Sequence, residues 1–169
     1  MVIDRCWAMP NSHTFSIKPI AKLINEYHPL SCVSIDPFAN SSKIASITND
    51  IDPQYNTDYH MDATDFLKMF ADSSVDLVLY DPPYSPRQLS ECYKSLGLSV
   101  NMQTTQSSYW AIQKKEIARI LKPNGVCITC GWNSGGIGQN YGMQIQRILL
   151  VPHGGWHNDT IVTVDKKLA

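Results

Sequence analysis

Four consecutive residues, Asp81, Pro82, Pro83 and Tyr84, combine groups that suit the chemistry of a planar amine. They follow a short apolar run, residues 75–80, of the kind that forms a parallel strand covered on both faces. The prolines cannot donate to a strand ladder, so we expect the strand to end at about Asp81. Their fixed φ angles orient the carbonyl groups beside a carboxylate and an aromatic ring. We call these four residues the Asp-Pro-Pro-Tyr turn.

Three further aspartates are expected near the same place. Asp36 and Asp50 each follow a predicted strand, and Asp62 precedes a predicted helix. Ligands of open α/β sheets bind outside the carboxyl ends of the strands, so these carboxylates should line one edge with Asp81. We expect Asp50 to hold ribose hydroxyls, with Asp52 as the alternative, and Asp62 to accept from an adenine amino group. Asp62 has a second interpretation as a helix cap.

Alternating strand and helix patterns position these turns. Strands are expected at residues 31–35, 45–48, 74–80, 126–131, 143–151 and 160–166, and helices from a cap at Ser16, after residue 65 and over residues 108–121. This order predicts a doubly wound, mostly parallel α/β sheet in a single domain, residues 1–169. The directly linked last two strands predict a hairpin at the end of the sheet, with one antiparallel strand. Residues 86–106 predict one short helix and a mobile loop.

Composition narrows the class of protein. The chain has 169 residues, 43% hydrophobic and 17% charged, which suits one globular domain. Its net charge of -1 gives no overall attraction to nucleic acid or to a membrane. No apolar run approaches a membrane span and no signal peptide is recognisable, so we expect a cytoplasmic protein. Among five irregularly spaced cysteines, Cys127 and Cys130 form a C-x-x-C within a strand, which favours core thiols over a metal site.

From about residue 12 to residue 132, and more weakly in the terminal hairpin, the chain resembles the S-adenosylmethionine-dependent amino-methyltransferases, above all the DNA adenine-N6 methyltransferases. The Asp-Pro-Pro-Tyr turn matches their catalytic motif in full. Asp36-Pro37-Phe38 resembles their cofactor loop, and Ser16-Ile17-Lys18 resembles the segment that covers the methionine end of the cofactor. The resemblance implies a Rossmann-like fold and an S-adenosylmethionine site. The expected cofactor-binding residues are Ser16, Ile17, Lys18, Asp36, Pro37, Phe38, Asn40, Asp50 and Asp62.

Two features depart from the family pattern. The family's cofactor loop has a glycine soon after the Asp-Pro-Phe element, whereas this chain has Asn40, which can also adopt positive φ. The family also carries a sizeable target-recognition domain, and the 18 residues between Asp62 and Asp81 leave no room for one. We therefore expect a homodimer or a partner subunit to supply recognition. The expected substrate-binding residues lie after the turn and at the hairpin tip: Ser85, Arg87, His153, His157 and Asn158.

The resemblance implies direct methyl transfer to the N6 amine of adenine in DNA, without a metal. Asp81 and the Pro82 carbonyl would accept the amine N–H groups, and Tyr84 would stack on a base taken out of the duplex. An aspartate at the first motif position favours adenine over cytosine. Two alternatives stay open: the same chemistry on RNA or on a protein amine, and a weakly active partner subunit with this fold.

Overall fold

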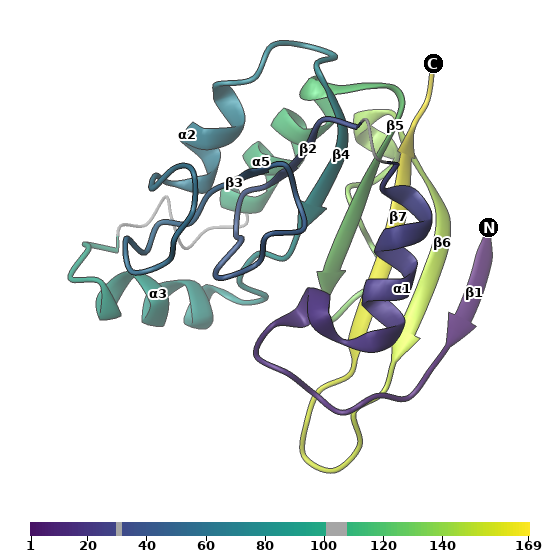
Figure 1. Ribbon diagram of the computed structural model, residues 1–169, viewed down its shortest axis with the longest axis horizontal. Coiled ribbons are helices and arrows are strands. Elements are labelled where there is room, and N and C mark those ends of the chain that lie inside the picture. The colour runs from purple at the N-terminus through teal and green to yellow at the C-terminus, as the bar shows by residue number, and fades with distance from the viewer. Residues whose placement is uncertain (30–31, 101–107) are drawn as a thin grey trace.

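The computed structural model describes residues 1–29, 32–100 and 108–169. Within them, one sheet contains seven strands in the order β1-β6-β7-β5-β4-β2-β3 (Figure 1). The strands are β1 Val2–Arg5, β2 Ser34–Asp36, β3 Ile47–Thr48, β4 Val75–Tyr80, β5 Leu121–Gly131, β6 Met143–Val151 and β7 Thr160–Lys167. The helices are α1 Lys18–Tyr27, α2 Ala63–Lys68, α3 Pro86–Ser95 and α5 Ser108–Ile120, with short 3₁₀ turns at Thr14–Ser16 and Gln139–Tyr141.

The sheet is mostly parallel, as predicted. Strand β7 runs antiparallel to both β5 and β6, and the other neighbouring strands pair in parallel. The late hairpin is therefore confirmed, but its position at the end of the sheet is wrong. Strand β1 pairs with the outer side of β6, from Val2 opposite Arg147 to Arg5 opposite Leu150. Four residues are too few to show a clear alternation of apolar and polar side chains, so the sequence pattern gives little indication of this strand.

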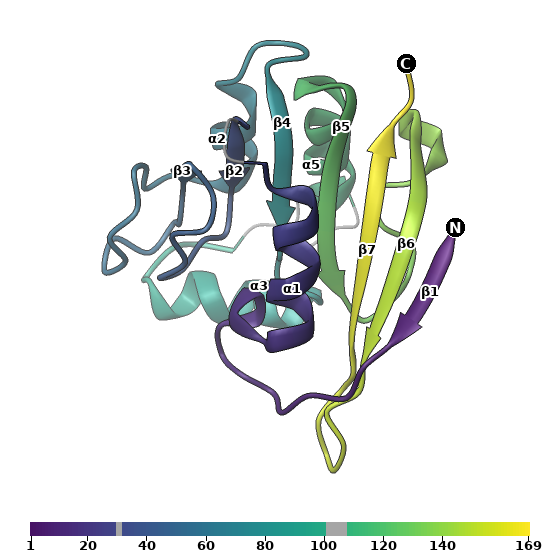
Figure 2. The ribbon, with the colours of Figure 1, turned by 45° about the vertical axis from the view of Figure 1, so that its right-hand side comes forward.

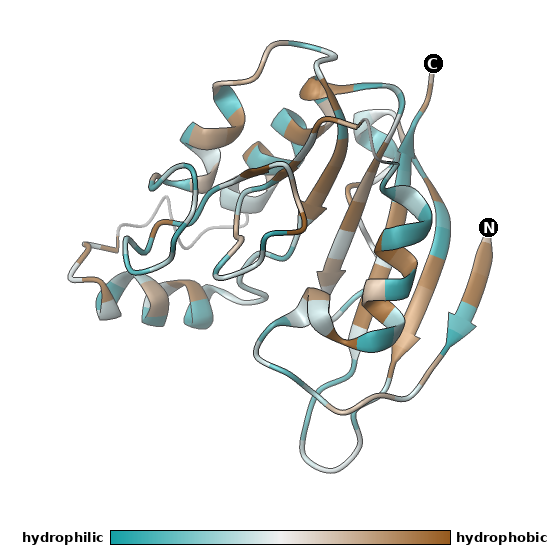
Figure 3. Cartoon of the chain, in the orientation of Figure 1, coloured by the Kyte–Doolittle hydropathy of each residue, from teal (hydrophilic) through white to brown (hydrophobic). Residues whose placement is uncertain are grey.

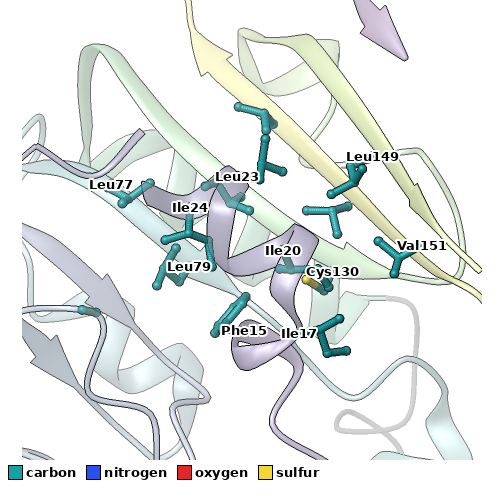
Figure 4. Close-up of a cluster of buried hydrophobic side chains, with 14 residues drawn as sticks. Phe15, Ile17, Ile20, Leu23, Ile24, Leu77, Leu79, Cys130, Leu149 and Val151 are labelled. Atoms are coloured by element: carbon teal, nitrogen blue, oxygen red, sulfur yellow. The ribbon is translucent and has the colours of Figure 1, made fainter. Parts of the chain in front are cut away.

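Helices cover both faces of the sheet (Figure 2). On one face, α1 packs against alternate residues of β4, including Leu77 and Leu79 (Figure 4). On the other face, α2 and α5 pack against Val78 and Tyr80. Successive strand residues point to opposite faces, so a strand buried on both sides needs a continuous apolar run. Figure 3 shows this hydrophobic character along β4.

The start of α1 differs from the prediction. Ile17 occupies the N-cap position without a side-chain cap, and Pro19 is tolerated in the first turn. Ser16 instead ends the preceding 3₁₀ turn, where its hydroxyl donates to the carbonyl of His13 at 2.7 Å. Phe15 and Ile17 point into the core on either side of Ser16. The extra 3₁₀ turn therefore exposes Ser16 rather than making it the cap.

Two other helices begin at side-chain caps. Asp62 Oδ1 accepts the N–H of Thr64 at 2.8 Å at the start of α2. Ser85 Oγ accepts the N–H of Gln88 at 3.2 Å at the start of α3, which is the short helix predicted after the Asp-Pro-Pro-Tyr turn. The loop predicted to follow α3 lies partly outside the described residues. Met69, at the C-cap of α2, is 48% exposed.

Both cysteines of the C-x-x-C in β5 are core residues, as predicted. Cys127 is 0% exposed and belongs to the cluster under α2 and α5, whereas Cys130 is 1% exposed and belongs to the cluster under α1. Their side chains thus lie on opposite faces of the sheet. Among the residues that the structure describes, no helix is both long enough and apolar enough to cross a membrane.

Candidate active site

The Asp-Pro-Pro-Tyr turn continues directly from the carboxyl end of β4, and hydrogen bonds from three directions fix its shape. The Tyr84 hydroxyl donates to Asp81 Oδ1. The Tyr84 backbone N–H donates to Gln88 Oε1 at 2.7 Å, and the Trp110 indole N–H donates to the Pro83 carbonyl at 3.0 Å. Neither Gln88 nor Trp110 was predicted as a site residue. For Trp110, the sequence did give one usable indication, because it lies on the inward side of its predicted helix.

A second aromatic residue contacts the turn. The Trp132 ring meets the Tyr84 ring edge-on, with centroids 5.4 Å apart and an interplanar angle of 70°. Trp132 follows β5 and is 43% exposed. Because β5 pairs with β4 in parallel, the residues after both strands meet at one sheet edge. The chain thereby places a partly exposed indole beside the motif tyrosine.

Tyr84 lines two pockets, of which the larger has a volume of about 660 Å³. Its walls come from the N-terminal segment 12–16, the loop after β2, the segment after β3, the Asp-Pro-Pro-Tyr turn, and helix α3 with the residue after it. Four of the expected cofactor residues line it: Ser16, Phe38, Asn40 and Asp50. Asp52, the alternative to Asp50, lines it as well. The pocket therefore gathers turns that are far apart in the sequence, as the strand-end argument predicts.

The loop after β2 is built around a residue with positive φ. Asn40 has φ of 53°, and its N–H donates to Asp50 Oδ2 at 2.8 Å. The expectation that Asn40 adopts the conformation usually left to glycine is confirmed. Asn49 supports the loop from below, because its amide donates to the Pro37 carbonyl at 3.1 Å. Phe38 both lines the pocket and packs on Tyr80, with centroids 5.9 Å apart.

Three carboxyl groups converge beneath the larger pocket. Asp36 is 0% exposed, and its Oδ1 accepts the Phe38 N–H at 3.0 Å, while Oδ2 has no partner among the described residues. Burial raises the pKa of Asp36 well above its usual value, and the charges of Asp81 and Asp50 raise it further. Burial likewise raises the pKa of Asp81, against hydrogen bonds from Tyr84 and Thr14. Both groups therefore gain from a nearby cation.

Several expected cofactor residues lie away from the pocket wall. Ile17 is buried in the core under α1, and neither Lys18 nor Pro37 is among the lining residues. Asp62 is also outside the lining, since its Oδ1 caps α2 and its Oδ2 accepts the Tyr93 hydroxyl. The side-chain contacts of Asp62 thus match its helix-cap interpretation. Instead, the N-terminal wall consists of residues that the sequence did not single out: Ser12, His13, Thr14 and Phe15.

A smaller pocket of about 280 Å³ lies on the other side of the turn. Pro82, Pro83 and Tyr84 line both pockets, so the turn forms their common wall. The other side chains that line the smaller pocket are mostly aromatic or small, and one of them carries an ammonium group. These residues are Tyr80, Pro86, Trp110, Lys114, Thr129, Cys130, Gly131, Trp132, Asn133 and Gly136. We call this second site the aromatic pocket.

The expected substrate residues divide into two groups. His153 is 6% exposed; its Nδ1 donates to the Ala8 carbonyl and its Nε2 accepts from the Thr160 hydroxyl, both at 2.8 Å. Its predicted substrate-facing role is therefore wrong, because the hairpin and the N-terminal segment enclose it. By contrast, His157 and Asn158 line a shallow hollow that also includes Trp132. The hairpin tip thus lies at the same edge as the turn, as expected (Figure 1).

Ser85 and Arg87, expected to bind substrate, have local partners. Ser85 caps α3, and neither residue is among those that line the two pockets. Arg87 pairs with Glu91 one turn later on the same helix at 2.8 Å, with both side chains largely exposed. An exposed pair of this kind contributes little stability and leaves the guanidinium available to solvent. A substrate role for these residues remains a prediction.

Comparison with known proteins gives a fold but no close relative. No protein-family model and no curated protein matches the sequence. Among solved structures, Burkholderia thailandensis 1,6-didemethyltoxoflavin-N1-methyltransferase, bound to 1,6-didemethyltoxoflavin and S-adenosylhomocysteine, matches 90% of this chain and 78% of its own, at 10% identity and a TM-score of 0.60. TrmN from Thermus thermophilus matches 90% of this chain at 15% identity and a TM-score of 0.59; the match spans 49% of TrmN.

For a third solved structure, the match covers nearly the whole of that protein. A methyltransferase from Methanosarcina mazei, described as SAM-dependent, matches 86% of this chain and 97% of its own, at 13% identity and a TM-score of 0.55. Identities this low carry information about architecture alone. The seven-stranded sheet, the single antiparallel strand and the helices on both faces agree with these structures. The chain thus has the Rossmann-like fold of the S-adenosylmethionine-dependent methyltransferases.

Proposed function

We propose that this protein transfers a methyl group from S-adenosylmethionine to the exocyclic N6 amine of adenine in DNA. One observation carries the proposal: the rigid Asp-Pro-Pro-Tyr turn is the common wall of two pockets. Direct transfer between two bound molecules needs a donor site and an acceptor site that meet at fixed polar groups. The larger pocket suits the donor, and the aromatic pocket suits a planar acceptor.

The larger pocket has the groups that S-adenosylmethionine needs. The cofactor carries an ammonium group and a sulfonium, and the carboxyls of Asp36, Asp50 and Asp81 converge on this side of the turn. Asp36 Oδ2 and Asn40 Oδ1 are buried acceptors without a partner in the described part of the chain, which fits a ligand rich in donors. When bound, the cofactor supplies an electrophilic methyl group. A cation here would also lower the raised pKa of each carboxyl.

The turn itself supplies the groups that act on the amine. The lone pair of an exocyclic adenine nitrogen is delocalised into the ring. Asp81 and the Pro82 carbonyl would accept the two N–H bonds, which favours a tetrahedral nitrogen with a localised lone pair. Because burial raises the pKa of Asp81, its carboxylate is also a good acceptor for the proton that the methylated nitrogen releases.

The aromatic pocket would receive the base. Tyr84, Trp110 and Trp132 give it three aromatic side chains, and stacking on such rings is the usual way to hold an unpaired base. A base inside duplex DNA cannot reach a buried carboxylate, so it must leave the stack. His157 and Asn158 lie next to Trp132 and are positioned to contact the nucleic acid around that base. Target recognition would be completed by a second copy of the chain or a partner subunit.

The test is transfer of tritiated methyl from labelled S-adenosylmethionine to unmethylated DNA, RNA and protein. We expect label in DNA, recovered as N6-methyladenine, and a loss of at least about 100-fold in Asp81→Ala. Binding of S-adenosylhomocysteine, measured by calorimetry, should fall far less than transfer in that variant, because Asp36 and Asp50 remain. Label only in RNA or protein would replace the proposed substrate. Cofactor binding without transfer to any of the three would favour the partner-subunit alternative.

A further inference from the structure

The aromatic pocket is lined by two side chains that donate hydrogen bonds, Lys114 and Asn133, as well as by Pro82, Pro83 and Tyr84 of the Asp-Pro-Pro-Tyr turn. We infer that Lys114 and Asn133 form a phosphate subsite, which binds the phosphate of the nucleotide whose base enters this pocket. The inference rests on the proposed function and specifies that the acceptor site binds a nucleotide. A neutral heterocycle or an unphosphorylated nucleoside would leave this subsite empty.

Lys114 is the one charged side chain among the residues that line the aromatic pocket. It lies on α5, half-buried, and has no hydrogen bond or ion pair with any residue that the structure describes. The neighbouring cations do have partners: Arg119 pairs with Asp72 and Glu116, and Lys122 pairs with Asp76. A partly buried ammonium without a counter-ion is unfavourable, so its position suits an anionic ligand.

Asp165 on β7 is a carboxyl group within electrostatic reach of Lys114, but the two form no ion pair among the described residues. Burial raises the pKa of Asp165, hydrogen bonds from the N–H groups of Ile137 and Gly138 oppose this rise, and the Lys114 charge opposes it more weakly. Asp165 lies directly beneath Gly136, where an added Cβ would come within 2.2 Å of Asp165 Oδ2. Gly136 therefore lies against this carboxylate and lines the pocket, whereas Asp165 is not among the lining residues.

Asn133 supplies the second donor. Its Oδ1 accepts the N–H of Gly135 at 2.9 Å, which fixes the orientation of the side-chain amide. The NH₂ group is then the end that is available to a ligand. Asn133 is exposed at the pocket wall and follows Trp132 directly. An ammonium and an amide NH₂ at one pocket both donate, which is the combination that a phosphate group needs.

The two ends of the pocket thus have opposite preferences. At the turn, the Pro82 carbonyl lies in the wall of the aromatic pocket and Asp81 lies in the wall of the larger pocket beside it, and both can accept hydrogen bonds from an amine. In the wall that α5 and the segment after β5 supply, Lys114 and Asn133 can donate to an anion. An adenine nucleotide has this polarity, because its base carries the amine and its sugar carries the phosphate. Free nucleotides and phosphodiesters share this chemistry, and the experiment separates them.

The experiment measures binding by calorimetry in the presence of saturating S-adenosylhomocysteine, which fills the larger pocket and keeps adenine compounds out of it. The ligands are adenosine, adenosine 5′-monophosphate and a short single-stranded oligodeoxynucleotide that contains adenine. We expect wild-type protein to bind at least one of the two phosphate-bearing ligands about tenfold more tightly than adenosine. Preference for the oligonucleotide alone would identify a phosphodiester as the ligand.

Lys114→Gln should abolish that preference and leave adenosine binding unchanged. It should also reduce the salt dependence of oligonucleotide binding by about one unit of the log–log slope. Lys114→Arg keeps the charge and should keep the preference. Lys115→Gln, on the exposed face of the same helix, is the matched control and should behave as wild type.

Three outcomes would overturn the subsite. Equal affinity of wild-type protein for all three ligands would remove it while leaving the acceptor pocket and the proposed function intact. Preference retained in Lys114→Gln would show that another group binds the phosphate. Failure of all three ligands to bind would overturn both the subsite and the proposed acceptor.

Discussion

The Tyr84 hydroxyl donates a hydrogen bond to Asp81 Oδ1, so the tyrosine of the motif occupies an acceptor that the proposed amine needs. Burial raises the pKa of the Tyr84 phenol, and the adjacent Asp81 raises it further, so this group remains a donor at neutral pH. Trp132, edge-on at 5.4 Å, limits the space into which the ring can move. The amine must therefore share the Asp81 carboxylate with the tyrosine or replace its hydrogen bond.

This relationship predicts a shift in pH dependence for Tyr84→Phe. The hydrogen bond from Tyr84 lowers the pKa of Asp81, so its removal should raise that pKa further. Transfer requires the carboxylate, and activity is lost as pH falls through the pKa. The acid limb of kcat/KM for DNA should thus move to higher pH. Tyr93→Phe, which removes a hydroxyl bonded to Asp62 instead, should leave the limb in place. An unmoved limb in Tyr84→Phe would contradict this coupling.

The loop after β2 should tolerate glycine at position 40 and reject a β-branched residue. Asn40 has φ of 53°, which glycine adopts freely and valine resists by about 1–2 kcal/mol. Asn40→Gly should therefore retain the free energy of unfolding in urea, whereas Asn40→Val should lower it by that amount. Both variants lose Asn40 Oδ1 and should bind S-adenosylhomocysteine more weakly, Asn40→Val the more so. Asn56→Val, at an exposed position, is the control. Wild-type stability in Asn40→Val would show that the turn has an alternative conformation.

Of the two histidines in the hairpin, His153 should affect stability and His157 should affect activity on DNA. His153→Ala removes two hydrogen bonds from a buried ring and should cost about 1–3 kcal/mol of stability, visible as a lower melting temperature. The double change His157→Ala and Asn158→Ala should leave the melting temperature and cofactor affinity unchanged. It should reduce kcat/KM for DNA on the order of tenfold, because each lost polar contact contributes about 1 kcal/mol. Full activity in the double variant would remove the hairpin tip from the substrate site.

Asp165→Asn should stabilise the protein in a pH-dependent way. Burial raises the pKa of Asp165, so the folded protein binds this proton more tightly than the unfolded chain. The free energy of unfolding therefore falls as pH rises from the pKa of Asp165 in the unfolded chain through its pKa in the folded protein. The total loss is about 1.4 kcal/mol for each pH unit that separates the two pKa values. The asparagine variant should match wild type near pH 4 and exceed it at pH 8 in urea unfolding. Asp159→Asn, on the exposed tip, should show no such divergence. A stability difference that is constant with pH would refute this assignment.

The local features of the chain were predictable from the sequence because each depends on a few neighbouring residues. Proline ends β4 at Tyr80, since it has no N–H to donate. The period of the apolar residues distinguishes β4 from α5, and asparagine tolerates positive φ at position 40. The Asp-rich turns converge on one edge because strands in a parallel sheet end together.

The tertiary structure alone decided which side chains face the pockets. One 3₁₀ turn before α1 is enough to turn Ser16 outward and Ile17 into the core, and no local pattern specifies that phase. His153 is enclosed because Ala8, 145 residues away, passes over it. Trp110 and Trp132 meet the turn only because α5 and β5 pack beside β4. The sequence by itself determined the elements, the turn chemistry and the edge of the sheet. The long-range packing of those elements determined the residues that form the site.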